Sequence, residues 1–147
     1  MTVTAEQSLR ERRGAIVAEH LAAENRHDVE ATIATFHRAR YEVNGETSEG
    51  ETAVRDLLHE LMTGFPDFHA EVQKLHHADD AVIGEGRLSG THNGPFAGVP
   101  ATGRRVDYPI VAIFEFEEDR LLCEKVYFDG ATILTQIGVL PEPGDTR

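Results

Sequence analysis

The first third of the chain has the hydrophobic spacing of amphipathic helices. Between residues 5 and 25 apolar side chains recur at helical spacing, at Leu9, Ile16, Val17 and Leu21, which predicts a first helix. Asp28 follows a short polar break and is a typical N-cap residue, so we expect a second helix to begin there. Tyr41 and Val43 then alternate with polar residues up to the turn pair Asn44-Gly45, which favours a short strand.

A third helix is the clearest prediction of the pattern. Ser48 and Glu51 have the spacing of a capping box. Gly64 followed by Pro66 is typical of a helix end. Between these two signals runs a continuous apolar stripe, formed by Val54, Leu57, Leu58, Leu61 and Met62.

From residue 67 onward the hydrophobic period changes to two, which indicates strands. We expect strands, the first with one irregularity, over residues 68–75, 81–93, 105–116 and 121–129. Turns are expected at 76–80 and 117–119, a Gly- and Pro-rich loop at 94–103 and a short helix at 131–137. Helices followed by an antiparallel meander predict an α+β fold with the helices on one face of a curved sheet. We expect a single domain over residues 1–140 and a loose tail over residues 141–147.

The composition narrows the function classes. The chain has 147 residues, with 26 acidic against 14 basic side chains and a net charge of -12. Nucleic acids and anionic membranes would repel such a protein, so neither is expected as a partner. The single cysteine excludes an internal disulfide and a cysteine-based zinc site. No apolar stretch is long enough to span a bilayer and the N-terminus lacks a signal-peptide pattern, so a cytoplasmic location is expected.

Four segments together resemble the SnoaL-like polyketide (ester) cyclases of the NTF2-like superfamily. They are Phe65-Pro66-Asp67, the run from Ser89 to Phe96, the run from Pro100 to Arg104, and Tyr127-Phe128-Asp129 with Gln136-Ile137-Gly138. The resemblance extends over residues 8 to 140. It implies a cone-shaped α+β fold, in which N-terminal helices pack on a strongly curved, mostly antiparallel sheet and enclose a pocket. It also implies a homodimer formed through the sheet.

The resemblance leaves several functions open. We expect a cofactor-free acid–base enzyme, of the cyclase or isomerase type, that acts on a small, mostly apolar carbonyl compound. One alternative is a non-catalytic module for small-molecule binding or dimerisation. A further alternative is an epoxide-hydrolase-like enzyme that uses Asp129 with Arg105 and Asp107. A surface ion pair is the favoured interpretation of Arg105 and Asp107. No metal and no cofactor are expected.

Asp129 is the first candidate for the acid or base, because it matches the acidic residue of the cyclases. A carboxylate in a partly apolar pocket has a raised pKa and can take a proton from a carbon beside a carbonyl. Asp129 could equally be the N-cap of the last helix. His92 and Tyr127 are the candidates for polarising the carbonyl. The cyclases also use a histidine on the strand before the last hairpin, where this chain has Phe114, Glu115 and Phe116.

Other polar residues are candidates for binding substrate. His20 and Glu24 lie one helical turn apart and are expected to face the pocket, as a polar patch rather than a metal site. His69 and Tyr108 are expected to line the pocket. Phe96 and Val99 give the 94–103 loop an apolar underside that suits a lid, although a purely structural loop explains the pattern equally well. The residues His76, His77, Asp79 and Asp80 are expected in a solvated turn, and Cys123 as a buried inert thiol.

Overall fold

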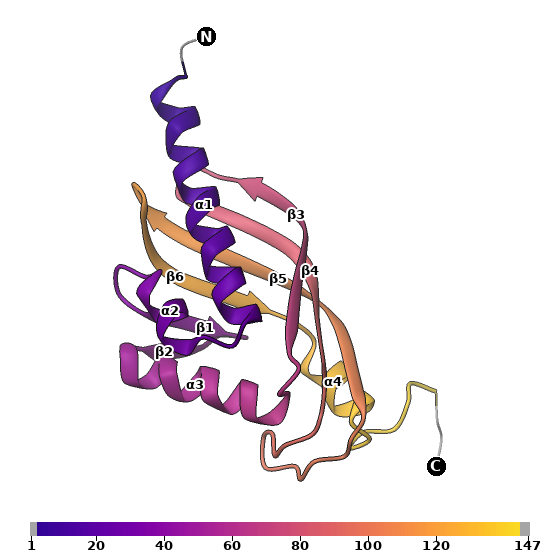
Figure 1. Ribbon diagram of the computed structural model, residues 1–147. Coiled ribbons are helices and arrows are strands. Elements are labelled where there is room, and N and C mark those ends of the chain that lie inside the picture. The colour runs from indigo at the N-terminus through magenta and orange to yellow at the C-terminus, as the bar shows by residue number, and fades with distance from the viewer. Residues whose placement is uncertain (1–2, 145–147) are drawn as a thin grey trace.

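The structure is a computed structural model that describes residues 3–144 (Figure 1). The chain begins with two helices and a short hairpin, continues with one more helix and a four-strand meander, and ends in a short helix. In order the elements are α1 (Ala5–Asn25), α2 (Val29–Ala34), β1 (Arg40–Val43), β2 (Glu46–Glu49), α3 (Glu51–Gly64), β3 (His69–His77), β4 (Ala81–Thr91), β5 (Arg105–Glu117), β6 (Arg120–Tyr127) and α4 (Gly130–Gln136).

The strands form one six-stranded sheet in the order β2-β1-β6-β5-β4-β3. Strand β1 pairs in parallel with β6, and every other pairing in this sheet is antiparallel. In Figure 1 the sheet curls around α1, which runs across one of its faces, while α2 and α3 lie beside β1 and β2. The predicted α+β fold, with N-terminal helices on a curved and mostly antiparallel sheet, is confirmed.

Several predicted boundaries are confirmed and one helix start is wrong. Asp28 caps α2 through its side chain, which accepts from the backbone N–H of Ala31. Ser48 does not cap α3, because it lies within β2, a strand that the pattern did not predict. The N-cap of α3 is Gly50, whose φ of 91° is in the region that favours glycine, and no side chain caps this helix.

The later strands also differ from the prediction in detail. The expected irregularity in β3 is a register shift between Val72 and Lys74. His76 and His77 belong to β3 and are not in the turn, which is confined to the residues after them. Of the expected tail, residues 145–147 lie outside the described part of the chain, and residues 141–144 are exposed. None of the helices within residues 3–144 is long and apolar enough to cross a membrane.

Buried apolar side chains form two clusters on the helix-covered face of the sheet. The first joins α1, α2 and α3 to the sheet and includes Val17, Leu58 and Phe114. The second joins β3, β4 and β5 to α4, through residues such as Phe68 and Ile133. A cavity lies between the two clusters, and residues from both clusters line it.

Candidate functional site

The cavity has a volume of about 200 Å³ and lies between α1, α3 and the inner face of the sheet. Most of its wall is aliphatic or aromatic, and two buried carboxylates, Glu24 and Glu124, lie in that wall together with the Tyr41 hydroxyl. The lining residues are Leu21, Glu24, Tyr41, Val43, Leu57, Leu58, Glu60, Leu61, Phe68, Ala70, Leu88, Phe96, Tyr108, Ile110, Ala112, Glu124, Val126, Phe128 and Ile133. An apolar pocket with a few convergent polar groups is the usual form of a small-molecule site.

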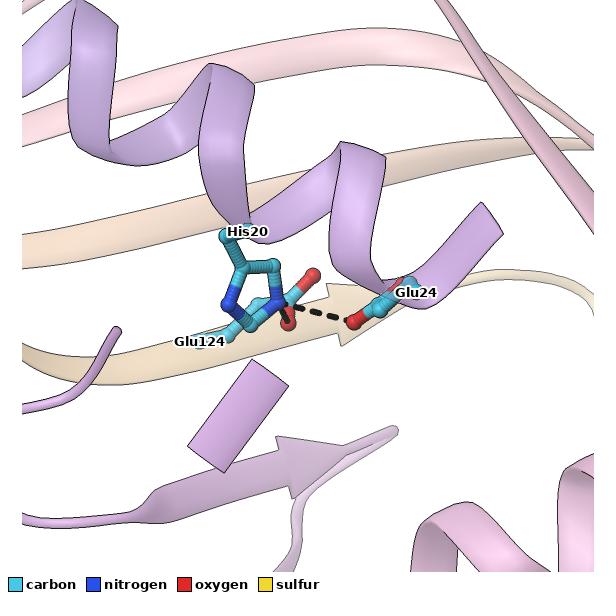
Figure 2. A group of neighbouring side chains, drawn as sticks. All are labelled: His20, Glu24 and Glu124. Carbon is cyan, nitrogen blue, oxygen red and sulfur yellow. Dashed lines mark hydrogen bonds and ion pairs between the residues drawn. The ribbon is translucent and has the colours of Figure 1, made fainter. Parts of the chain in front are cut away.

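Three elements bring the polar groups together. His20 and Glu24 lie one turn apart on α1, so their side chains project from the same helical face. Tyr41 of β1 and Glu124 of β6 are direct partners in the parallel pairing of these strands, which places their side chains next to each other. Figure 2 shows both carboxylates on the same side of the His20 ring, with Glu24 coming from the helix and Glu124 from the strand.

Hydrogen bonds join these four side chains into one network. His20 Nε2 lies 2.8 Å from Glu24 Oε1 and 2.9 Å from Glu124 Oε2. The Tyr41 hydroxyl donates to Glu24 Oε1 over 2.6 Å. On the other side of the ring, Thr35 Oγ1 lies 2.8 Å from His20 Nδ1 and uses its own proton to bond the Thr32 carbonyl. Thr35 therefore accepts a hydrogen bond from Nδ1–H. The other ring nitrogen, Nε2, is then the atom that bonds the two carboxylates.

The surroundings set the charges of the network. Burial lowers the pKa of His20, but Glu124 and Glu24 outweigh it and raise that pKa to about 10. Burial and the neighbouring Glu24 carboxylate raise the pKa of Glu124. Burial acts to raise the pKa of Glu24 as well, yet its interaction with His20 brings it below the ordinary value. With a pKa of about 10, His20 is cationic near neutral pH. The lowered pKa of Glu24 favours its anionic form, and the raised pKa of Glu124 favours its protonated form.

A metal ion can be held by His, Cys, Asp and Glu side chains whose ligand atoms lie close together. Within residues 3–144 one group of three such side chains meets this condition, namely His20, Glu24 and Glu124, whose ligand atoms all lie within 4.8 Å of one another. A metal on His20 Nε2 would have to displace the proton that this nitrogen shares with both carboxylates. The charges and hydrogen bonds of the network satisfy its members without a metal. Acid–base chemistry therefore accounts for this arrangement directly.

Asp129 is not among the residues that line this cavity. It is the N-cap of α4 and accepts from Ala131 N–H and from Thr132 Oγ1, each over 3.0 Å. Asp129 and Tyr127 line a separate open depression with Gln73, outside the cavity. Tyr127 is 45% exposed.

The reason for this placement is an irregularity between β5 and β6. Glu115 pairs with Cys123 and Phe116 with Leu121, so Leu122 is an extra residue in β6. An extra residue reverses the alternation of side chains between the two faces of a strand. After this extra residue, Glu124 has its side chain on the same inner face as Leu121, whereas Cys123 and Tyr127 do not.

His92 is fully buried but does not line the cavity. Its Nδ1 lies 2.9 Å from Thr102 Oγ1, across the base of the 94–103 loop, and its ring packs beside Phe65. Its Nε2 has no hydrogen-bond partner among the described residues. The structure thus brings none of the three expected catalytic residues, Asp129, His92 and Tyr127, to the cavity.

The residues expected to bind substrate agree better with the prediction than the expected catalytic residues do. Phe96 and Tyr108 line the cavity, and His20 holds its two carboxylates. His69 is exposed and takes no part in the wall, because its strand turns that side chain outward. The proposed set of Asp129 with Arg105 and Asp107 does not converge, because Asp107 is exposed and accepts from Arg87 over 2.7 Å.

Sequence reasoning missed Glu124 and the connection of Tyr41 to it. A glutamate within the apolar run from Leu121 to Val126 was the available signal, since a charged residue there must be either exposed or paired. Simple alternation assigned it to the outer face. Only the extra residue in β6 reverses that assignment.

Comparison with known proteins assigns a family. The family description of SnoaL-like polyketide cyclases matches residues 15–137 of the chain. Among curated protein sequences, none matches it.

Solved structures of similar fold have related descriptions. AclR, a candidate hydroxylase from Streptomyces galilaeus, is 26% identical with a TM-score of 0.77, over 88% of this chain and 83% of its own. A candidate SnoaL-like polyketide cyclase from Jannaschia sp. CCS1 is 24% identical with a TM-score of 0.81, over 89% and 94%. An NTF2-like protein of unknown function from Burkholderia pseudomallei K96243 is 18% identical with a TM-score of 0.73, over 86% and 98%. The last two support the fold alone.

Proposed function

The chain belongs to the SnoaL-like polyketide cyclase family, and from this membership and the chemistry of its cavity we propose that it catalyses proton transfer at a carbon next to a carbonyl group. The observation that carries the proposal is the position of Glu124. Its carboxyl group lies in the wall of an apolar cavity, is buried, and is bonded to a protonated histidine. Its raised pKa brings it toward the pH at which general acids and bases work best.

In the proposed reaction the Glu124 carboxylate takes a proton from the carbon beside the carbonyl. The electron pair of the broken C–H bond becomes the new C=C bond, and the carbonyl oxygen carries the negative charge. The enolate then follows one of two routes. It attacks a second carbonyl carbon, which closes a ring and leaves an alkoxide that takes the proton from Glu124, or it takes that proton back at another carbon, which isomerises the substrate. The His20 cation, held by Glu24, offsets the negative charge in the cavity during these steps.

Tyr41 and Glu24 are positioning residues in this proposal. The Tyr41 hydroxyl and His20 Nε2 both bond Glu24 Oε1, so Glu24 keeps the imidazole charged and oriented. The proton-transfer role thereby moves from Asp129 to Glu124. The small carbonyl ligand, the homodimer through the sheet and the cytoplasmic location stay predictions, as does a cofactor-free reaction.

The test is exchange of the α-protons of 2-tetralone, a neutral bicyclic ketone, followed by proton NMR in heavy water. We expect the protein to accelerate the exchange, and Glu124→Gln to lose about 10²- to 10⁴-fold of that acceleration because Gln cannot take the proton. Asp129→Asn keeps a good N-cap residue and is the matched control, which should exchange at the rate of the unchanged protein.

Three results would contradict the proposal. If Asp129→Asn loses the exchange while Glu124→Gln keeps it, the base is Asp129. If both variants keep it, neither carboxylate is the base. If the ketone binds without accelerated exchange, the cavity is a binding site only, which is the non-catalytic alternative.

A further inference from the structure

We infer that the ligand of this cavity is an uncharged molecule of one ring or two fused rings, and that Phe96 and Leu61 set this size limit. That the ligand carries a carbonyl group rests on the proposed function. The limits on size and charge rest on the cavity alone. They distinguish this chain from an enzyme that accepts three or four fused rings.

The volume gives the size limit. Pockets for drug-sized ligands usually measure about 300–1,000 Å³, whereas this cavity measures about 200 Å³. An apolar cavity of about 150 Å³ is known to take up benzene. The present cavity therefore has room for one substituted ring or two fused rings, and a third ring would have to extend out of the cavity or displace its wall.

Most of the wall cannot move without disturbing the core. Tyr108, Phe68 and Ala112 are buried members of the two apolar clusters. Close packing makes such positions costly to displace. The partly exposed wall includes Leu61 of α3 and Phe96 of the 94–103 loop. The other partly exposed apolar lining residues are Leu21, Val43, Leu57, Ile110, Val126 and Phe128.

The position of Phe96 is held by its neighbours. Its ring packs at 5.0 Å from the Phe65 ring, and its backbone N–H and C=O both bond Val99 across a tight turn. A Cβ atom at Gly64 would lie 2.8 Å from the Cβ of Phe96, so the helix end and the loop are in direct contact. Phe96 is therefore held in place as part of the wall.

The charges of the lining give the second limit. Glu24, Glu60 and Glu124 line the cavity, and no Lys or Arg is among its described lining residues. The whole chain carries a net charge of -12, which repels anions at a distance as well. The nearby cation, His20, is already bonded to both Glu24 and Glu124. A carboxylate or phosphate on the ligand would therefore find no unpaired cation in the wall, so ketones, esters and lactones fit better than free acids.

The experiment is isothermal titration calorimetry of the full chain with three compounds. These are 2-tetralone, the three-ring ketone anthrone, and tetralin-2-carboxylate, which keeps the two-ring frame and adds a charge. We expect 2-tetralone to bind at least about tenfold more tightly than either other compound, or about 1.4 kcal/mol. Phe96→Ala should bring anthrone to within threefold of 2-tetralone. Leu75→Ala, at an exposed position on β3 outside the cavity, should change nothing.

Leu61→Ala is a second enlarging variant, to be used if Phe96→Ala does not fold as judged by circular dichroism. The inference is overturned if the unchanged protein binds anthrone or the carboxylate as tightly as 2-tetralone, or if it binds none of the three. It is also overturned if neither enlarging variant admits anthrone. Binding of 2-tetralone with the expected preferences but no proton exchange would overturn the proposed reaction and leave the limits on size and charge in place.

Discussion

His20 gives the fold a dependence of stability on pH that can be worked out from its surroundings. The ring is completely buried, and although burial lowers its pKa, Glu124 and Glu24 raise it to about 10. In the unfolded chain the pKa returns to about 6.5. Between these values the folded protein holds a proton that the unfolded chain has released. The stabilisation is therefore complete below about pH 6.5 and is lost as the pH rises toward 10.

The magnitude follows from the same two values. Within the window each pH unit removes at most about 1.4 kcal/mol of the free energy of unfolding. Raising the pH from 7 to 9 should therefore lower that free energy by about 2 to 3 kcal/mol. Burial raises the pKa of Cys123 from 9.0 to about 11, so titration of this thiol lowers the stability of the protein only above pH 9. Glu124, whose pKa is also raised, contributes a loss in the same direction that begins near its ordinary value of 4.5.

The assay is urea unfolding followed by circular dichroism at a series of pH values from 7 to 9. His20→Gln removes the titrating ring, so it should be less stable at pH 7 and show little further loss up to pH 9. His76→Gln is the matched control, because His76 is an exposed histidine that pairs with Glu85, and it should keep the slope of the unchanged protein. A flat stability of the unchanged protein across this window, or the same slope in His20→Gln, would refute the reasoning.

Three further substitutions test other parts of the structure. Tyr41→Phe removes the hydroxyl that donates to buried Glu24 and should lower the free energy of unfolding, measured in urea, by about 1 to 3 kcal/mol; an unchanged midpoint would contradict the bond. Asp129→Ala removes the cap of α4 and should cost about 1 kcal/mol while the rate of α-proton exchange stays the same. Gly94→Ala would place a Cβ atom 2.0 Å from the Thr63 carbonyl oxygen, so it should lower stability by about 1 to 3 kcal/mol and speed cleavage of the 94–103 loop in limited proteolysis.

Part of the site could be read from the chain because it depends on local spacing. His20 and Glu24 share a helical face at any position of α1 in the fold, and their approach to the pocket was predicted from that spacing. Asp28 and Asp129 cap helices by contacts within three residues of themselves. Asp28 was predicted as an N-cap residue, and for Asp129 the cap was one of two interpretations left open. Phe96 and Tyr108 were expected at the pocket and lie there.

The rest of the site depends on pairing between distant strands. Glu124 faces inward only because Leu122 is an extra residue against β5, and the strand pattern by itself does not show where such an irregularity falls. Tyr41 meets Glu124 only because β1 pairs in parallel with β6, across some eighty residues of chain. The sequence shows a glutamate among apolar residues, but the strand pairings that turn it inward leave no local signal.

By itself, then, the sequence determined the order and type of most elements, the helix cap at Asp28, and the family through its motifs. These features follow from hydrophobic period, capping and residues close together in the chain, where the physics is local. The tertiary structure decided which carboxylates enter the cavity, what charge each one carries, and how large a molecule the cavity holds. Those properties follow from strand register and from burial, and both exist only once distant parts of the chain have packed together.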